Sequence, residues 1–193
     1  MKKTFVVGIA GGSASGKSSF CDRLEKKLGS YNKMVIHMDD YFKPEEQRPY
    51  SKGPVMETMY VDDNHPDTIN LEQLHTDLKA AISSNYDLII LEGLLVLWDE
   101  EIFSALDLKL FVDCRPDERI VRRLRRNMTW GLAFDERANV YLDMVRYRHD
   151  EYVEPTKWKA DFILNGSKPS ELAEEGIVEL IKSNIQINNN EIK

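Results

Sequence analysis

The sequence has few cysteines, no long apolar run and no excess of positive charge. Its two cysteines, Cys21 and Cys114, lie far apart and without metal-type spacing, which indicates reduced thiols in a cytoplasmic protein. No apolar segment approaches the roughly 18 residues of a membrane span, so we expect no membrane partner. The formal net charge is −7, which argues against a general affinity for nucleic acid.

The chain also lacks internal repeats, low-complexity segments and an interdomain linker. Its 193 residues suit one domain with a full hydrophobic core. Hydrophobic residues make up 42% and charged residues 31%, which is ordinary for a globular protein. We expect a single domain over residues 1–183 and a polar, fraying tail over residues 184–193.

Residues 11–18, GGSASGKS, match the pattern G-x-x-x-x-G-K-[ST]. Glycines in this pattern let successive backbone N–H groups wrap around phosphate oxygens. Lys17 would reach the outer phosphates, and the Ser18 hydroxyl would bind Mg²⁺. The expected members of this nucleotide site are Gly11, Gly12, Ser13, Ala14, Ser15, Gly16, Lys17, Ser18 and Ser19.

The flanking residues favour this interpretation over a secretory signal peptide. Two lysines and an apolar run open the chain, but Gly8 interrupts the run, which is shorter than the roughly 7–15 residues required. The run is instead β-branched and aromatic, as in a buried parallel strand. Phe20, Leu24 and Leu28 then recur at helical spacing, so strand, phosphate loop and helix follow in the required order.

Short apolar runs alternate with helical patterns along the whole chain. The expected strands are Phe5–Ala10, Met34–Met38, Leu88–Leu91, Leu108–Val112 and Phe162–Leu164. The expected helices cover residues 17–28, 70–83, 117–128, 136–152 and 170–183. This alternation predicts an α/β fold, with a five-stranded, mostly parallel sheet covered by helices on both faces.

Acidic residues follow three of these strands, at the edge where such sheets bind ligands. Glu92 follows the third strand and resembles the acidic residue that helps hold Mg²⁺ in phosphate-loop proteins, where Asp is usual. Asp39 and Asp40 follow the second strand. Asp39 could accept a proton from a hydroxyl group, although either residue could instead cap a helix or turn.

An arginine-rich helix is expected after the fourth strand, where residues 119–126 read RIVRRLRR. Arg119, Arg122, Arg123 and Arg126 would share one face. Guanidinium groups pair bidentately with phosphate oxygens, so this face suits phosphate binding. Some of these arginines could be solvated instead, most readily Arg119 and Arg125.

A helical lid is expected over about residues 122–140. The stretch NMTWGLAFD places Gly131 between the arginine-rich helix and the next helix, as a flexible turn would require. Lids exclude water, so that a phosphate passes to its acceptor and not to solvent. Trp130 could stack on a base or could simply pack against its neighbours.

Six stretches together resemble the uridine kinase-like family, in the phosphoribulokinase and uridine kinase group of P-loop kinases. They are GGSASGKSS, MDDYFKP, NHPDTINLEQL, LIILEGLLVLWDEEI, LDLKLFVDCRPDERIVRRLRR and YRHDEYVEPTKWKADFIL. The resemblance runs from about residue 4 to 165 and keeps the family's order. It implies the P-loop NTPase three-layer fold and an ATP- and Mg²⁺-dependent kinase acting on a small hydroxylated acceptor such as uridine or cytidine.

The resemblance also implies roles for individual residues. Asp39 would be the catalytic base, with Lys17, Arg123 and Arg126 as further catalytic groups. Ser18, Glu92 and Asp39 would surround the metal ion. The acceptor would meet Asp39, Phe42, Asn64, Arg123 and Arg126.

Three departures from the family concern the acceptor. The PIYDF-like hairpin that reads a pyrimidine is absent, Asn64 stands where the family has Asp, and the lid stretch NMTWGLAFD contains no arginine. Nicotinamide riboside kinases also lack the hairpin and have a motif close to MDDYFKP. A nicotinamide riboside kinase, or a kinase of another hydroxylated metabolite, therefore stays an alternative.

Two other classes of protein fit the sequence less well. A GTPase switch needs an [NT]-K-x-D motif, and the nearest match, Thr156 to Lys159, fails at its last position. A nucleic-acid-associated ATPase usually brings a further domain or a basic surface. We expect a small-molecule kinase, and a homo-oligomer is one option for its assembly.

Overall fold

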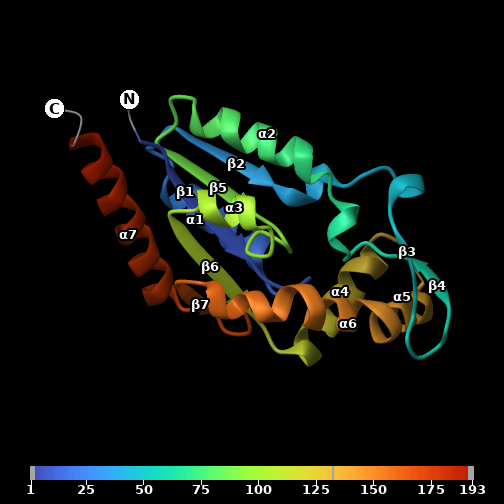
Figure 1. The fold of residues 1–193 in the computed structure, drawn as a ribbon. Helices are drawn as coiled ribbons and strands as arrows, with labels where there is room; N and C mark the ends of the chain where they lie inside the picture. The colour runs from blue at the N-terminus through green and yellow to red at the C-terminus, as the bar shows by residue number, and fades with distance from the viewer. Residues whose placement is uncertain (1–2, 132, 191–193) are drawn as a thin grey trace.

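The computed structural model describes residues 3–131 and 133–190. Its central sheet has the strand order β2-β5-β1-β6-β7, and all neighbouring strands are parallel. The strands are β1 (Phe5–Ala10), β2 (Lys33–His37), β5 (Leu88–Glu92), β6 (Leu108–Asp113) and β7 (Phe162–Asn165). All five predicted strands are therefore present, each within about one residue of its expected bounds (Figure 1).

Helices cover both faces of this sheet because side chains along each strand alternate between the faces. Val6 of β1 packs in one buried cluster with Leu74 and Leu78 of α2 (Leu71–Ile82) and with Ile102 of α3 (Glu100–Ala105). Val7 packs on the other face against α1 (Lys17–Lys27) and α7 (Glu171–Asn190). The result is the predicted three-layer arrangement.

Helix α7 is longer than predicted. It begins at Glu171 and continues to Asn190, so residues 184–190 are helical and not a fraying tail. The reason is that Ile177, Ile181 and Ile185 recur every four residues and are all buried. Residues 191–193 lie outside the described part of the chain. Within residues 3–131 and 133–190, no helix has the length and apolar character needed to cross a bilayer.

Two short strands form a hairpin that the sequence pattern did not predict. Strand β3 (Tyr50–Lys52) pairs antiparallel with β4 (Met59–Val61). Three short 3₁₀ helices flank it, namely η1 (Met38–Tyr41), η2 (Glu45–Gln47) and η3 (Pro66–Thr68). The hairpin lies beyond the carboxyl ends of the main strands, beside the helices that follow β6 (Figure 1).

Those helices include the predicted lid. Helix α4 (Pro116–Thr129) ends at a turn where Gly131 has a φ of 75°, and α5 (Phe134–Val140) follows. Leu132, within the predicted lid, lies outside the described residues. The chain continues helically through η4 (Tyr141–Val145), α6 (Arg146–Arg148) and η5 (His149–Val153), then as the 3₁₀ helix η6 (Glu154–Lys159). That this region moves as a lid stays a prediction.

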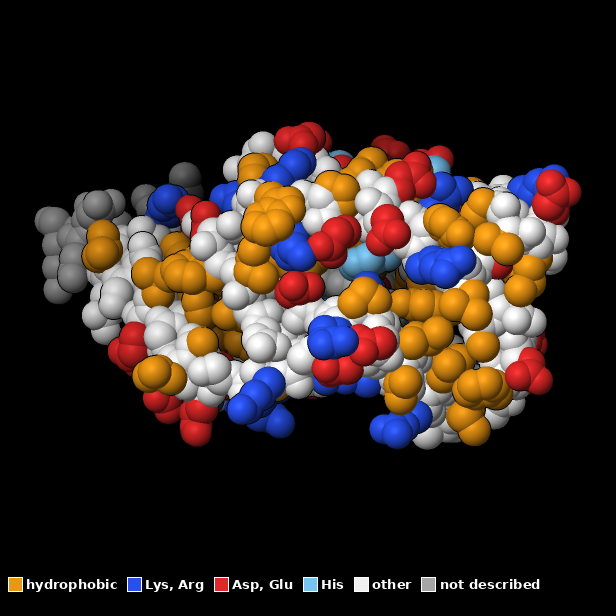
Figure 2. All heavy atoms as spheres, turned by 90° about the horizontal axis from the view of Figure 1, so that it is seen from below, with side chains coloured by type: hydrophobic (Ala, Val, Ile, Leu, Met, Phe, Trp, Pro, Cys, Tyr) orange, Lys and Arg blue, Asp and Glu red, His pale blue; other side chains and the backbone are white. Residues whose placement is uncertain are grey.

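The end of the molecule formed by the hairpin and the lid carries many exposed apolar side chains. Figure 2 shows hydrophobic side chains gathered at that end. The exposed apolar residues of the hairpin include Met56 and Met59, and those of the lid include Trp130 and Phe134. Both segments border the carboxyl edge of the sheet, where the predicted site residues meet.

Candidate active site

The phosphate loop links β1 to α1 with an unusual backbone. Gly16 has a φ of 101°, a conformation that glycine adopts without steric cost. A Cβ on Gly11 would lie 2.6 Å from the Val112 carbonyl oxygen, so the close approach of β6 also requires glycine there. Ala14 has a φ of 63°, which is strained for a residue with a side chain. Such strain is typical of a ligand-binding loop held by its surroundings.

Behind the loop, Glu92 is the centre of a polar cluster. Its carboxylate accepts a hydrogen bond from the Ser18 hydroxyl at 3.2 Å, and its Oε2 lies 3.8 Å from Nζ of Lys17. Glu92 is only 4% exposed, so these neighbours replace most of the water around its charge. His37 Nδ1 lies 2.9 Å from Glu92 Oε1, because His37 and Glu92 are paired across β2 and β5.

The donor atoms of this cluster suit a small hard cation. Magnesium is commonly bound by one or two protein oxygens, with water and substrate phosphates completing its shell. Ser18 and Glu92 supply such oxygens beside the phosphate loop. No set of three or more His, Cys, Asp or Glu residues is arranged for a metal within residues 3–131 and 133–190. The Ser18 and Glu92 oxygens by themselves fit Mg²⁺ bound together with a nucleotide.

A cavity of about 260 Å³ opens in front of the phosphate loop. Asp39 lines it and Asp40 does not, which separates the two acids of the DD pair. The predicted residues that line it are Ser13, Lys17, Ser18, Asp39, Phe42, Asn64, Arg123 and Arg126. Residues from four separate parts of the sequence are thus brought to one cavity.

Arg123 and Arg126 reach the phosphate loop from α4. Arg123 donates to the Ser13 hydroxyl at 2.7 Å, and Arg126 donates to the same oxygen at 3.4 Å. Burial, and then the neighbouring Arg126 charge, lower the pKa of Arg123 from its usual value. Arg126 also lies over the ring of Trp130, with its guanidinium carbon 5.2 Å from the ring centroid. Two positive charges therefore lie beside the first serine of the loop.

The expectation that Arg119 is solvated is wrong, whereas Arg125 is exposed as expected. Arg119 is only 5% exposed, and its Nε donates to the Cys114 carbonyl oxygen at 3.1 Å. Its Nη1 occupies space beside Gly12 that a Cβ there would need. Arg119 turns inward because α4 begins directly after β6 and carries its first turns across the phosphate loop.

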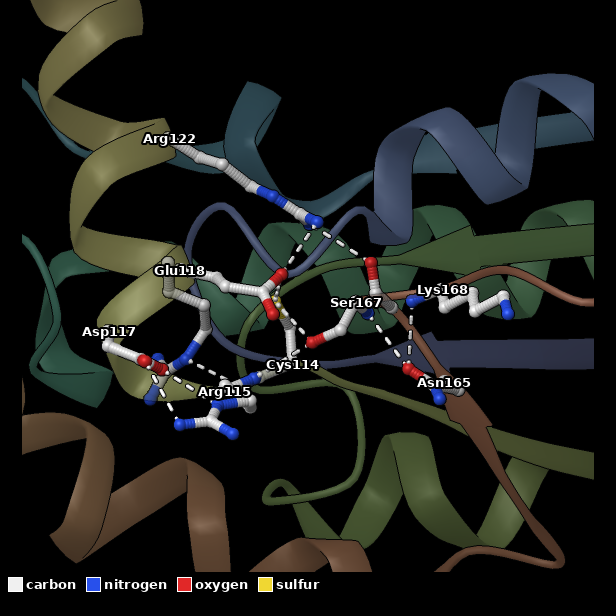
Figure 3. A network of polar contacts seen from close by, with 10 residues as sticks. Cys114, Arg115, Asp117, Glu118, Arg122, Asn165, Ser167 and Lys168 are labelled. Atoms are coloured by element: carbon white, nitrogen blue, oxygen red, sulfur yellow. Dashed lines mark hydrogen bonds and ion pairs between the residues drawn. The ribbon is translucent and has the colours of Figure 1, made fainter.

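A second cavity, of about 430 Å³, lies on the other side of the loop, between α1, β7 and α7. Arg122 borders it and donates to the Gly166 carbonyl oxygen at 3.0 Å and to Glu118 at 3.1 Å. Figure 3 shows Arg122 reaching from α4 towards the loop after β7, where Asn165 accepts from the N–H groups of Ser167 and Lys168. The remaining wall is mainly apolar, formed by Phe20, Val112, Ile163, Leu164, Pro169 and Ala173.

Several residues of the candidate site were not predicted from the sequence. His37 has no motif of its own, and only the pairing of β2 with β5 places it against Glu92. Asp63, Leu94 and Leu95 line the first cavity. Trp130, for which the sequence left base stacking and packing open, lines it as well. Asp63 directly precedes the NHPD stretch, and the two leucines are the last residues of EGLL, so the motifs themselves already pointed to these positions.

Several known proteins have sequences similar to that of this chain. The model of the Phosphoribulokinase / Uridine kinase family matches residues 51–172. The uridine kinase of Geobacillus kaustophilus is 35% identical over an alignment of 187 positions, which covers 84% of this chain and 86% of that protein. The chain belongs to this family.

Other relatives extend the similarity over nearly the whole chain. The uridine kinase of Bacillus subtilis is 31% identical over an alignment of 206 positions, which covers 97% of this chain and 98% of that protein. As a member of the Phosphoribulokinase / Uridine kinase family, the chain is a phosphotransferase acting on a hydroxyl group, as its sequence predicted. These relatives do not favour the nicotinamide riboside kinase alternative.

Solved structures confirm the fold. A structure described as a possible uridine kinase from Bacillus stearothermophilus has a TM-score of 0.58 at 18% identity, covering 84% of this chain and 89% of that one. Phosphoribulokinase from Rhodobacter spheroides has a TM-score of 0.61 at 13% identity, covering 86% of this chain and 71% of that one. The predicted α/β fold of P-loop kinases is therefore confirmed.

Proposed function

We propose that this protein transfers the γ-phosphate of ATP, with Mg²⁺, to a ribose hydroxyl of a pyrimidine nucleoside, with uridine as the first candidate. The carrying observation is that Asp39, Lys17 and Ser18 line one cavity, so a proton acceptor faces a phosphate-binding loop. The names of the curated relatives support uridine as the acceptor.

In this proposal Asp39 accepts the proton of the acceptor hydroxyl as its oxygen bonds to the γ-phosphorus. The bond between the γ-phosphorus and the bridging oxygen breaks, and ADP leaves. Lys17, Arg123 and Arg126 stabilise the negative charge on the phosphoryl oxygens, which is the main task of a protein in phosphoryl transfer. Mg²⁺, when bound, neutralises further phosphate charge, and Ser18 and Glu92 would hold it.

The acceptor would occupy the rest of the first cavity. Asn64 is 8% exposed and lines the cavity, so its amide can bond ribose hydroxyl groups. Phe42 and Ile69 supply apolar surface for a ring or a sugar face. The missing PIYDF-like hairpin leaves Trp130 and Asp63 as side chains near the entrance that could contact a base.

The nucleotide base would occupy the second cavity. This cavity touches Gly16 and Ser19, which belong to the predicted nucleotide site, so it lies where a base attached to the bound phosphates can reach. Its apolar wall suits a purine face, and Arg122 can lie against the ring as a cation.

We place the protein in the cytoplasm, since Cys21 and Cys114 are both free and buried.

The test is incubation of the purified protein with Mg²⁺-ATP and a panel of acceptors, followed by mass spectrometry. The panel contains uridine, cytidine, nicotinamide riboside, pantothenate and several sugars. Uridine monophosphate is the expected product. Phosphorylation of another acceptor with uridine untouched would contradict the proposed specificity. Nucleotide binding without any phosphorylated product would contradict the proposed reaction.

A further inference from the structure

Arg148 and His149 are neighbours in the chain but contact different parts of the active site. Arg148 is the last residue of α6, and His149 begins η5, a π-helical turn. Successive side chains on a helix point about 100° apart, so two adjacent residues can reach different neighbours. π-helical turns often occur at functional sites, because they redirect side chains locally.

Arg148 points toward the loop that carries the predicted acceptor residues. Its Nε donates to Oδ2 of Asp62 at 2.6 Å, and its Nη2 donates to the Ser51 hydroxyl at 3.0 Å. Asp62 is completely buried, so its charge depends on this guanidinium for compensation. Arg148 therefore joins the helix to the end of the β3–β4 hairpin.

Asp62 in turn fixes the residues that follow it. Its Oδ1 accepts from the N–H of Asn64 at 3.3 Å, and its carbonyl oxygen accepts from the Thr68 hydroxyl at 2.6 Å. Asp63 and Asn64 line the cavity that Asp39 also lines. A change at Arg148 would thus reach the acceptor side of the cavity through Asp62.

His149 points the other way, toward the phosphate loop. It is 8% exposed, and a Cβ on Gly12 would lie only 2.9 Å from its Cε1 and 3.0 Å from its Nδ1. Its Nε2 lies 3.2 Å from Glu154, which fixes the ring orientation. With Arg119 on the same side of Gly12, the ring of His149 forms the support against which the loop packs.

We propose that Arg148 and His149 are positioning residues that set the acceptor loop and the phosphate loop in register. Arg148 holds residues 62–64 in place, and His149 supports Gly12 and the residues that follow it. Because both side chains extend from one short helical stretch, the distance between the acceptor hydroxyl and the γ-phosphate depends on this stretch. The inference rests on the proposed function for the identity of the two ligands.

The first test does not depend on any ligand. Hydrogen–deuterium exchange, read by mass spectrometry, compares the wild type with Arg148→Met and His149→Ala. We expect Arg148→Met to speed exchange in residues 50–68 and leave residues 11–19 unchanged. His149→Ala should do the reverse. Faster exchange in both segments for both variants would reveal a general structural role and overturn the proposal, as would no change in either.

The second test separates the two substrates kinetically. Arg148→Met should raise the KM for the acceptor about tenfold, which corresponds to about 1.4 kcal/mol, with the KM for ATP within about twofold. His149→Ala should raise the KM for ATP and not that of the acceptor. Arg146→Met and Tyr147→Ala are the controls, because both residues are exposed on the same helix and should leave both constants unchanged.

Two further variants keep the tests decisive if a first variant unfolds. Arg148→Lys keeps the charge next to Asp62, and Ser51→Ala removes only the second hydrogen bond. Both should give part of the acceptor effect. A rise in the two KM values together would overturn the positioning roles. A wild-type protein that phosphorylates nothing in the acceptor panel would instead contradict the proposed function, and the exchange experiment would still decide the positioning roles.

Discussion

The Ser18 hydroxyl lies 3.2 Å from Oε1 and 3.3 Å from Oε2 of Glu92, although 74 positions separate the two residues in the chain. The contact forms because β1 and β5 are adjacent and parallel, with Ile9 opposite Glu92. The loop that follows β1 and the last residue of β5 therefore meet at one edge. Ser18 and Glu92, two of the three predicted magnesium ligands, are brought together by this pairing.

Replacing Glu92 by Gln should weaken the use of Mg²⁺. The amide has the same shape but carries no charge, so it holds a hard cation poorly. We expect the Mg²⁺ concentration for half-maximal rate to rise at least about tenfold, since even outer-shell partners change metal affinity by ~10–100-fold. Initial rates, measured at a fixed ATP concentration and varied Mg²⁺, give this concentration. Glu100→Gln, at an exposed position in α3, is the matched control. An unchanged Mg²⁺ requirement in Glu92→Gln would remove Glu92 from the proposed metal site.

Replacing Asp39 by Asn should separate binding from transfer. The variant cannot accept a proton, so we expect phosphate transfer to fall by about 10²–10⁴-fold. Nucleotide affinity should stay near the wild-type value, because Lys17 and the phosphate loop are intact. Calorimetric titration and a product assay check the two parts. Asp40→Asn should transfer phosphate normally, since Asp40 does not line the cavity of Asp39. Equal losses in the two variants would refute Asp39 as the base.

The final turns of α7 should contribute to stability. Ile185 is 1% exposed, whereas Ile187 is 53% exposed, although only one residue separates them. Ile185→Ala should lower the free energy of unfolding by about 2–5 kcal/mol, because it leaves a cavity against the sheet. Ile187→Ala should change it by less than about 0.5 kcal/mol. Urea unfolding followed by circular dichroism measures both values, and equal effects would contradict the packing of α7.

Acid should loosen the hairpin through Asp143. This buried carboxylate accepts from the N–H groups of Val55 at 2.8 Å and Met56 at 3.0 Å. Burial alone would raise the pKa of Asp143, but the N–H groups of Met56 and Val55 outweigh it and hold the pKa below its usual value. Its stabilising effect is then complete above the unfolded pKa of about 3.9 and is lost as the pH falls through the lower folded value.

Asp143→Asn tests this pH dependence. The variant should be less stable than the wild type at about pH 7, and the difference should shrink as the pH falls through the folded pKa of Asp143, where the wild-type side chain also becomes neutral. Urea unfolding at a series of pH values from about 7 downward gives the comparison. Asp135→Asn, at an exposed position in α5, serves as the control and should show no such difference. A difference that stays constant with pH would show that the charge of Asp143 is not involved.

The sequence predicts the central strands β1 and β5 well because they are fully buried. Val6, Val7 and Ile9 of β1 face helices on one side or the other, so the strand appears as one continuous apolar run. The β3–β4 hairpin gives no such signal. Its strands have three residues each, and its position depends on distant contacts such as that between Asp143 and Val55. Propensity within a short window cannot register such contacts.

The candidate site likewise contains residues that the sequence identifies and residues that only the folded structure identifies. Lys17 and Ser18 belong to a motif whose spacing is fixed by one bound group, so the motif alone identifies them. His37 and Arg119 are placed by strand pairing and by the path of α4, and no local pattern distinguishes them from ordinary surface residues. Arg148 and His149 are also found only from the folded structure, because their contacts lie far away in the chain.

The strand order has a consequence for synthesis on the ribosome. β1 emerges early, yet Phe5 pairs with Leu88 and Val7 with Leu108, which are made about 80 and about 100 residues later. At ~5–20 residues per second, the nascent strand waits about 5–20 seconds for its neighbours. During that time FVVGIA is an apolar, uncharged segment of the kind that self-associates. Capture by a chaperone at this stage would protect the strand that later carries the phosphate loop.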